Sequence, residues 1–195
     1  MIDAINITKF QATVEELEEH IIFWILAAGK NGVTTAACLD SLLVNSCLSF
    51  GDFNWSPFDI IKELDDQGIL ELKLKEHGIG CFNLKAQYLR SLLKTNLDLK
   101  KCTLEELENI KGIGPKTARC FLIHTRRNQQ YAGLDTHILT FLRDKGIDAP
   151  KSTPTGKKYK ELEKIFLNFV KKSGKTVAEF DLMIWNKYRK KEKVA

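Results

Sequence analysis

Cysteine is scarce in this sequence, and the few cysteines present are not grouped. Five occur in 195 residues, no two form a Cys-x-x-Cys pair, and none lies beyond position 120. Disulfide frameworks, zinc sites and iron–sulfur clusters all need closely grouped cysteines, so the pattern argues against each of them. We therefore expect reduced, mostly buried thiols, no iron–sulfur cluster and no protein-bound metal at cysteine.

Long apolar runs and a targeting segment are lacking too. The longest apolar run, Ile21–Ala28, is far shorter than the roughly 20 residues that a membrane-spanning helix needs. The amino terminus has no basic stretch before an apolar one, as a secretory signal would have. We expect a protein that stays inside the cell, cytoplasmic or, in a eukaryote, nuclear, with no membrane partner.

The sequence also shows no internal repeat, no low-complexity tract and no convincing strand alternation. Apolar residues recur instead at helical spacing through most of the chain. Residues near Ile69 and Leu72 could form a short strand, but a helix fits better. The predicted fold class is all-α. Capping boxes, which mark helix starts, occur at three places: Thr13–Glu16, Thr103–Glu106 and Thr176–Glu179.

The overall charge is mildly basic, with a formal net charge of +5 and a sequence pI of about 8.9. Such a balance suits a polyanionic partner without establishing one. The 44% hydrophobic and 28% charged residues are ordinary for a globular protein, and 195 residues suffice for one large domain or two small ones.

The most informative segment, residues 107–118, predicts a helix, a tight Gly-Ile-Gly turn and a second helix. Gly112 and Gly114 permit unusual backbone angles and close approach of a phosphate. The turn amides and the positive end of the next helix together form an anion site, and Pro115 suits that helix's first turn. A plain connection between two helices is the alternative interpretation.

A second motif makes the interpretation specific. Leu-Asp-Thr-His-Ile at 134–138 follows Gly-Ile-Gly-Pro-Lys-Thr-Ala at 112–118, and a glycine-bearing turn at 80–86 precedes both. This combination resembles the helix-hairpin-helix base-excision DNA glycosylases, a superfamily that contains endonuclease III, the adenine glycosylases and the 8-oxoguanine glycosylases. The clear resemblance covers about residues 78–146.

The resemblance implies that Lys116 is the nucleophile and Asp135 the catalytic carboxylate. A neutral lysine amine can attack the sugar C1′ and form a Schiff base, and a carboxylate can stabilise the positive charge that builds on the sugar. The helix dipole and partial burial favour neutral Lys116, whereas a nearby Asp135 favours the charged form. Otherwise, Lys116 could be a phosphate-binding or solvated lysine and Asp135 only a helix cap.

The resemblance also implies two helical subdomains that flank a DNA-binding cleft. We expect a central subdomain at 29–128, with the helix-hairpin-helix at about 103–125. Residues 1–28 and 129–195 are expected to form the second subdomain together. The expected partner is double-stranded DNA with a damaged base, bound by a monomer.

Further candidate residues are weaker, because each has an ordinary structural alternative. Lys30 or Asn31 could be the wedge that fills the gap left by an extruded nucleotide, although a plain turn is as good an interpretation. Phe180, Trp185 and Tyr188 could stack on the base, or form part of a core. His124 and His137 are expected to be structural. The DNA-binding candidates are Lys111, Gly112, Ile113, Gly114, Thr117 and Arg119.

The lesion is the least determined part of the prediction. Many endonuclease III relatives carry four carboxy-terminal cysteines for an iron–sulfur cluster, which this chain lacks. The compact form and the Phe-Asp-Leu-Met-Ile-Trp run at 180–185 are similar to the small microbial 8-oxoguanine glycosylase/lyases. Oxidised pyrimidines or alkylated bases stay open, as does a non-enzymatic DNA-binding protein. No cofactor is expected beyond a possible monovalent cation at the hairpin turn.

Overall fold

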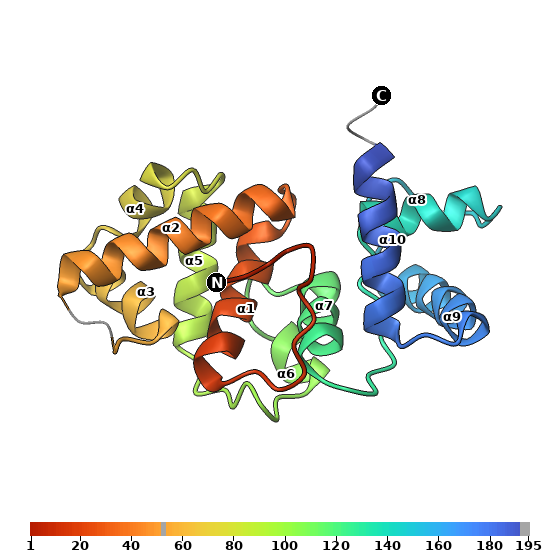
Figure 1. The fold of residues 1–195 in the computed structure, drawn as a ribbon, viewed down its shortest axis with the longest axis horizontal. Coiled ribbons are helices and arrows are strands. Elements are labelled where there is room, and N and C mark those ends of the chain that lie inside the picture. The colour runs from red at the N-terminus through yellow and green to blue at the C-terminus, as the bar shows by residue number, and fades with distance from the viewer. Residues whose placement is uncertain (52–53, 192–195) are drawn as a thin grey trace. The chain divides into compact units, whose positions relative to one another are not determined.

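The computed structural model describes residues 1–51 and 54–191, and every regular element in that part of the chain is a helix (Figure 1). The all-α prediction is confirmed, and the segment near Ile69 is helical. The helices are α1 Val14–Ala27, α2 Gly32–Phe50, α3 Pro57–Asp66, α4 Leu70–Glu76, α5 Phe82–Leu93, α6 Leu104–Glu108, α7 Pro115–Thr125, α8 Thr136–Asp144, α9 Gly156–Ser173 and α10 Val177–Lys191.

Helix starts follow the local sequence signals closely. Thr13 and Thr103 each form a reciprocal capping box with the glutamate three residues later. Thr176 does the same, since its backbone N–H donates to Glu179 Oε2 at 2.9 Å and its hydroxyl accepts from the Glu179 N–H at 3.3 Å. Each pair satisfies two backbone donors that a helix start leaves unpaired.

The chain divides into two compact units. Unit 1 comprises residues 1–7 and 12–114, and unit 2 comprises residues 8–11 and the chain from Pro115 on. These boundaries differ from the predicted ones, because α1 belongs with the central helices and α7 with the carboxy-terminal ones. The reason is that α1 is buried on nearly all sides within unit 1, where it packs against α2, α3 and α5.

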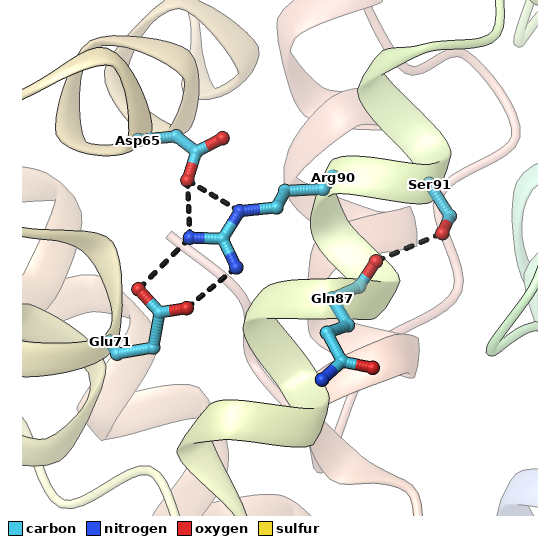
Figure 2. A network of polar contacts seen from close by, with 5 residues as sticks. All are labelled: Asp65, Glu71, Gln87, Arg90 and Ser91. Carbon is cyan, nitrogen blue, oxygen red and sulfur yellow. Dashed lines mark hydrogen bonds and ion pairs between the residues drawn. The ribbon is translucent and has the colours of Figure 1, made fainter. Parts of the chain in front are cut away.

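Unit 1 is held by an apolar core and by one arginine that joins three helices. Ile21, Ile25 and Leu39 are fully buried in the core. Arg90 of α5 donates from Nε to Asp65 of α3 at 2.6 Å, and its two terminal nitrogens bind Glu71 of α4 at 2.5 and 2.9 Å (Figure 2). The fork geometry of the guanidinium lets it pair with both carboxylates at once.

By length and composition alone, α2 could cross a membrane, because it has 19 residues of high mean hydropathy. Core helices of water-soluble proteins also meet these criteria, and α2 buries Leu39 and Leu42 completely. Its contacts lie with α1 and α3. The observation therefore carries little weight for a membrane role.

Unit 2 is organised around α10, which packs against α7, α8 and α9 (Figure 1). Its core is rich in aromatic side chains. The ring of Phe141 on α8 makes edge-to-face contacts with Phe166, Phe169, Phe180 and Tyr188, at centroid distances of 5.3–6.4 Å. Such contacts contribute beyond area burial alone. This packing fixes α8 and α10 on each other, and thereby the side chains that both helices present to α7.

Candidate active site

The segment predicted to form the helix-hairpin-helix consists of α6, a turn at residues 109–114, and α7. Gly112 has a φ of 98°, a conformation that side chains disfavour, and a Cβ there would run into the ring of Tyr88. Gly114 has no positive φ, and a Cβ there would meet open space. The backbone conformation thus requires glycine only at position 112. At position 114, the absence of a side chain leaves the backbone of the turn uncovered.

Between the two glycines, Ile113 anchors the turn in the core of unit 1. Its side chain is buried, and its backbone N–H donates to the Ile110 carbonyl at 3.0 Å. Lys111 just before the turn is exposed. Thr117, predicted to bind DNA, is buried in α7. The exposed candidates for phosphate contact are therefore Lys111 and the backbone at Gly114.

Lys116 and Asp135 lie at the starts of two helices of unit 2. Lys116 is the second residue of α7, and Asp135 is the N-cap of α8, where its Oδ1 accepts the Ile138 N–H at 2.8 Å. Both residues are half-buried. The cap fixes the direction of the carboxylate, because one oxygen is committed to the helix start.

Lys116 is surrounded by acidic groups that oppose the effect of burial. Burial alone would lower the pKa of the Lys116 amine, but the neighbouring Cys120, Asp135 and Asp181 raise it, and the net shift is upward. Burial raises the pKa of the Cys120 thiol to about 12, so the thiol is neutral at pH 7. A neutral thiol carries no charge, so the upward shift of the Lys116 pKa at neutral pH comes from the two carboxyl groups and not from Cys120.

Burial also raises the pKa of the Asp135 carboxyl, while Lys116 opposes that shift. Each of the two side chains thus shifts the pKa of the other. The sequence reasoning did not select Cys120 or Asp181 for this cluster. Cys120 lies one helical turn beyond Lys116, a spacing that could have identified it. Asp181 lies 65 positions away from Lys116, and no local pattern indicates it.

A buried network supports the segment that precedes Asp135. The Tyr159 hydroxyl donates to the Ala132 carbonyl at 2.6 Å and accepts the Leu134 N–H at 3.2 Å. Glu163 Oε1 accepts the Ala132 N–H at 2.9 Å and pairs with Arg119 Nε at 2.8 Å. Two residues of α9 thereby fix the backbone on which Asp135 stands.

The same network corrects one prediction. Arg119 was expected to bind DNA phosphate, but its side chain is only 7% exposed. Its guanidinium pairs with Glu163 and lies 4.6 Å from the centre of the Tyr159 ring. If the Arg119 guanidinium turned towards a phosphate, Glu163 would be left as an unpaired buried charge, which is strongly unfavourable. Arg119 is a supporting residue of the Asp135 segment.

The three aromatic candidates on α10 differ in how far they are buried. Phe180 and Tyr188 are buried in the core of unit 2, so the prediction that they form a base pocket is corrected. Trp185 is half-buried; its ring meets His137 edge to face at 6.1 Å, and the Arg189 guanidinium lies 5.0 Å from its centre. Of the three, Trp185 alone combines an accessible ring with a position next to the start of α8.

The predicted wedge residues lie in the turn between α1 and α2 of unit 1. Lys30 and Asn31 are both exposed. The Asn31 side chain already accepts the Thr34 N–H at 3.1 Å as the N-cap of α2. Within the described ranges, 1–51 and 54–191, no three His, Cys, Asp or Glu side chains are grouped as a metal site would require.

Comparison with known proteins supplies independent information. The profile of a family described as 8-oxoguanine DNA glycosylase matches residues 9–175. An 8-oxoguanine DNA glycosylase/AP lyase of Methanocaldococcus jannaschii is 34% identical over 129 residues. That match covers 60% of this chain, and the chain spans 60% of the length of that relative.

Solved structures agree with the profile. The M. jannaschii 8-oxoguanine glycosylase/lyase, solved with a 15mer DNA containing 8-oxoguanine, has a TM-score of 0.65 at 25% identity, covering 90% of this chain and 81% of its own. The 8-oxoguanine DNA glycosylase of Thermotoga maritima has a TM-score of 0.66 at 25% identity, covering 90% and 80%.

Proposed function

Because this chain belongs to the 8-oxoguanine DNA glycosylase family, we propose that it excises 8-oxoguanine from duplex DNA and cleaves the strand at the resulting abasic site. The observation that carries this proposal is the cluster of Lys116 and Asp135 at the starts of α7 and α8, with the hairpin turn immediately before α7. A helix-hairpin-helix that only clamps DNA has no need of either side chain.

In the proposed reaction, Lys116 is the nucleophile. Its neutral amine attacks C1′ of the damaged nucleotide, the glycosidic bond breaks, and a Schiff base then links the lysine to the sugar. Asp135 remains an anion that stabilises the positive charge developing on the sugar. Trp185 is the remaining candidate for stacking on the extruded base, and Lys30 or Asn31 for filling the gap in the duplex.

In this proposal, the hairpin turn binds the DNA phosphates. Lys111, the backbone from Gly112 to Gly114 and the amino terminus of α7 can hold the DNA backbone without reading sequence. The lysine supplies the nucleophile, so the proposal requires no cofactor. A monovalent cation at carbonyl groups of the turn would be compatible with it. We propose that the protein acts as a monomer on double-stranded DNA.

The test is a cleavage assay over duplexes that carry 8-oxoguanine, thymine glycol, an alkylated base or no lesion. We expect strand cleavage and borohydride-trapped adduct with 8-oxoguanine above all others. Cleavage of thymine glycol with intact 8-oxoguanine would instead assign an oxidised-pyrimidine activity. A band shift without cleavage of any duplex would identify a DNA-binding protein and overturn the proposal.

A further inference from the structure

Asp181 on α10 is a second carboxylate in the cluster, and the reaction as proposed gives it no part. Its side chain is buried, with the residue 7% exposed. Oδ2 lies 3.3 Å from Nε2 of His124, whose Nδ1 meets the Thr8 hydroxyl at 2.8 Å. Oδ1 is buried and has no hydrogen-bond partner within the described chain. A buried acceptor without a hydrogen bond is unfavourable and rare in folded proteins, so this oxygen needs an explanation.

Asp181 contacts the face of α7 that also carries the nucleophile. Lys116, Cys120 and His124 are spaced four residues apart on α7 and share one face of the helix. Because α10 packs against α7 and Asp181 bonds His124, Asp181 faces one end of this row, and the Lys116 side chain reaches Cys120 in the middle of it. Its negative charge raises the pKa of both Lys116 and Asp135.

The proposed reaction needs a proton acceptor, and Asp135 is poorly suited to that task. Lys116 is held charged by its neighbours, so its ammonium must lose a proton before the amine can attack. If Asp135 took that proton, it would lose the negative charge that stabilises the sugar cation. Its Oδ1 is moreover bonded to the Ile138 N–H, whereas Oδ1 of Asp181 has no bond.

We propose that Asp181 accepts the proton of the Lys116 ammonium on Oδ1, while His124 holds Oδ2 and Asp135 stays ionised. This assignment rests on the proposed function. The freed lone pair forms the bond from Nζ to C1′, and the electron pair of the breaking glycosidic bond leaves with the base. The proton held by Asp181 then passes to the departing base, so that charge and atoms balance.

Binding of DNA favours this transfer. A covering duplex removes water, and desolvation penalises the charged forms of both the lysine and the carboxylate. Proton transfer within the pair leaves the net charge unchanged, so the reactive form carries as many protons as the resting form. The adduct-forming rate should therefore be flat between about pH 6 and 9. The other titratable groups that face the cluster are Cys120 and His124 of α7, Asp135 and His137 at the start of α8, and Tyr159 of α9.

The test is Asp181→Asn, measured by single-turnover borohydride trapping on a duplex with a pre-formed abasic site and on one with 8-oxoguanine. We expect trapping about 100-fold slower on both duplexes at pH 7, the usual scale for a lost general base. The rate should then rise about tenfold per pH unit towards pH 9, because solvent must now deprotonate Lys116. Asp135→Asn should slow the reaction on 8-oxoguanine far more than on the abasic site, which has no base to release.

Asp144→Asn is the matched control. Asp144 of α8 also bonds into α10, accepting the Tyr188 hydroxyl at 2.7 Å, and it lies outside the cluster. We expect wild-type rates and a flat pH profile for this variant. A purely structural role of Asp181 would lower the melting temperature without introducing a pH dependence, so thermal unfolding is measured on both variants.

The opposite outcome is well defined. If Asp181 only keeps Lys116 charged, Asp181→Asn lowers the lysine pKa and speeds trapping at pH 7; a rate equal to or above wild type overturns the proposal. If that variant does not fold, the wild-type profile decides, since a tenfold rise per unit from pH 7 to 9 would exclude an internal acceptor. Wild-type protein that traps on neither duplex refutes the proposed function itself, a result distinct from both.

Discussion

The chain contains the turn Gly-Ile-Gly twice, at 78–80 and at 112–114, and in both cases a helix with an early lysine follows. The two turns are built alike. Gly78 and Gly112 have positive φ angles of 77° and 98°, and Ile79 and Ile113 are both buried. What differs is the environment of the lysine in the next helix.

Lys85, after the first turn, is buried and bonded to backbone. Its Nζ donates to the carbonyls of Ile25, Leu26 and Ala28 at 2.7, 2.5 and 3.2 Å. These groups end α1, where a helix leaves carbonyls unpaired and where its dipole favours a cation. Lys85 therefore ties α5 to the end of α1, just before the turn that carries Lys30 and Asn31.

Lys116, after the second turn, meets ionisable side chains instead. It lies at the positive end of its helix, beside Asp135 and Asp181, with a neutral thiol one turn away. Carbonyl partners cannot take up a proton, whereas carboxylates can. A Gly-Ile-Gly turn thus positions a lysine without determining its role, which depends on the groups around the amine.

Lys116→Ala should have the largest effect on activity. We expect the borohydride-trapped adduct on 8-oxoguanine duplex to fall at least about a thousandfold, as for removal of other nucleophiles. DNA binding and the melting temperature should change little, because the hairpin amides and the other basic residues remain. Adduct formed at the wild-type rate would show that another amine is the nucleophile.

Lys85→Met should show the reverse pattern. The apolar part of the side chain stays, but two buried carbonyls and one part-buried carbonyl lose a charged donor, which we expect to cost about 3 kcal/mol of unfolding free energy. For a chain of this size that corresponds to a melting temperature lower by about 6–12 °C. Protein that remains folded should still form the adduct with Lys116. Lys85→Arg, which keeps the charge, is the control and should recover part of the stability.

The sequence predicted the features that depend on neighbouring residues, but not the contacts between residues far apart in the chain. The capping boxes, the hairpin and the Asp135 cap each depend on residues within about five positions, where steric and hydrogen-bonding rules are strong. The family resemblance located Lys116 and Asp135 in the same way, through two short motifs. These features could be predicted from the sequence without knowing how the helices pack.

Long-range pairs leave no comparable signal in the sequence. Arg119 pairs with a glutamate 44 positions away, and His124 with Asp181 57 positions away. Arg119 is buried because Glu163 and Tyr159 of α9 contact its guanidinium, and the sequence near Arg119 does not indicate either contact. The subdomain boundaries failed for the same reason, since the apolar surface of α1 could have packed on either set of helices.

Alanine substitutions at Gly112 and Gly78 should destabilise the two turns to different extents. Gly112→Ala should cost about 1–2 kcal/mol for the positive φ and more for the clash with Tyr88. Gly78→Ala should cost only the first amount, because its Cβ would meet nothing closer than the Cys38 sulfur at 3.4 Å. Denaturant unfolding of both variants measures the difference. Equal stabilities would mean that Tyr88 moves aside freely.

Lys111→Ala should have the smallest effect and tests a third kind of lysine, exposed and next to the turn. Its stability should match wild type, because the side chain lies at the surface. If it pairs with one phosphate, DNA affinity should fall a few-fold and the slope of log K against log salt should become shallower by about one. Lys73→Ala, in which the lost lysine pairs with Glu76 on α4 at 2.9 Å, is the control and should leave the slope unchanged. An unchanged slope for Lys111→Ala would remove this residue from the DNA contact, leaving phosphate binding to the backbone of the turn.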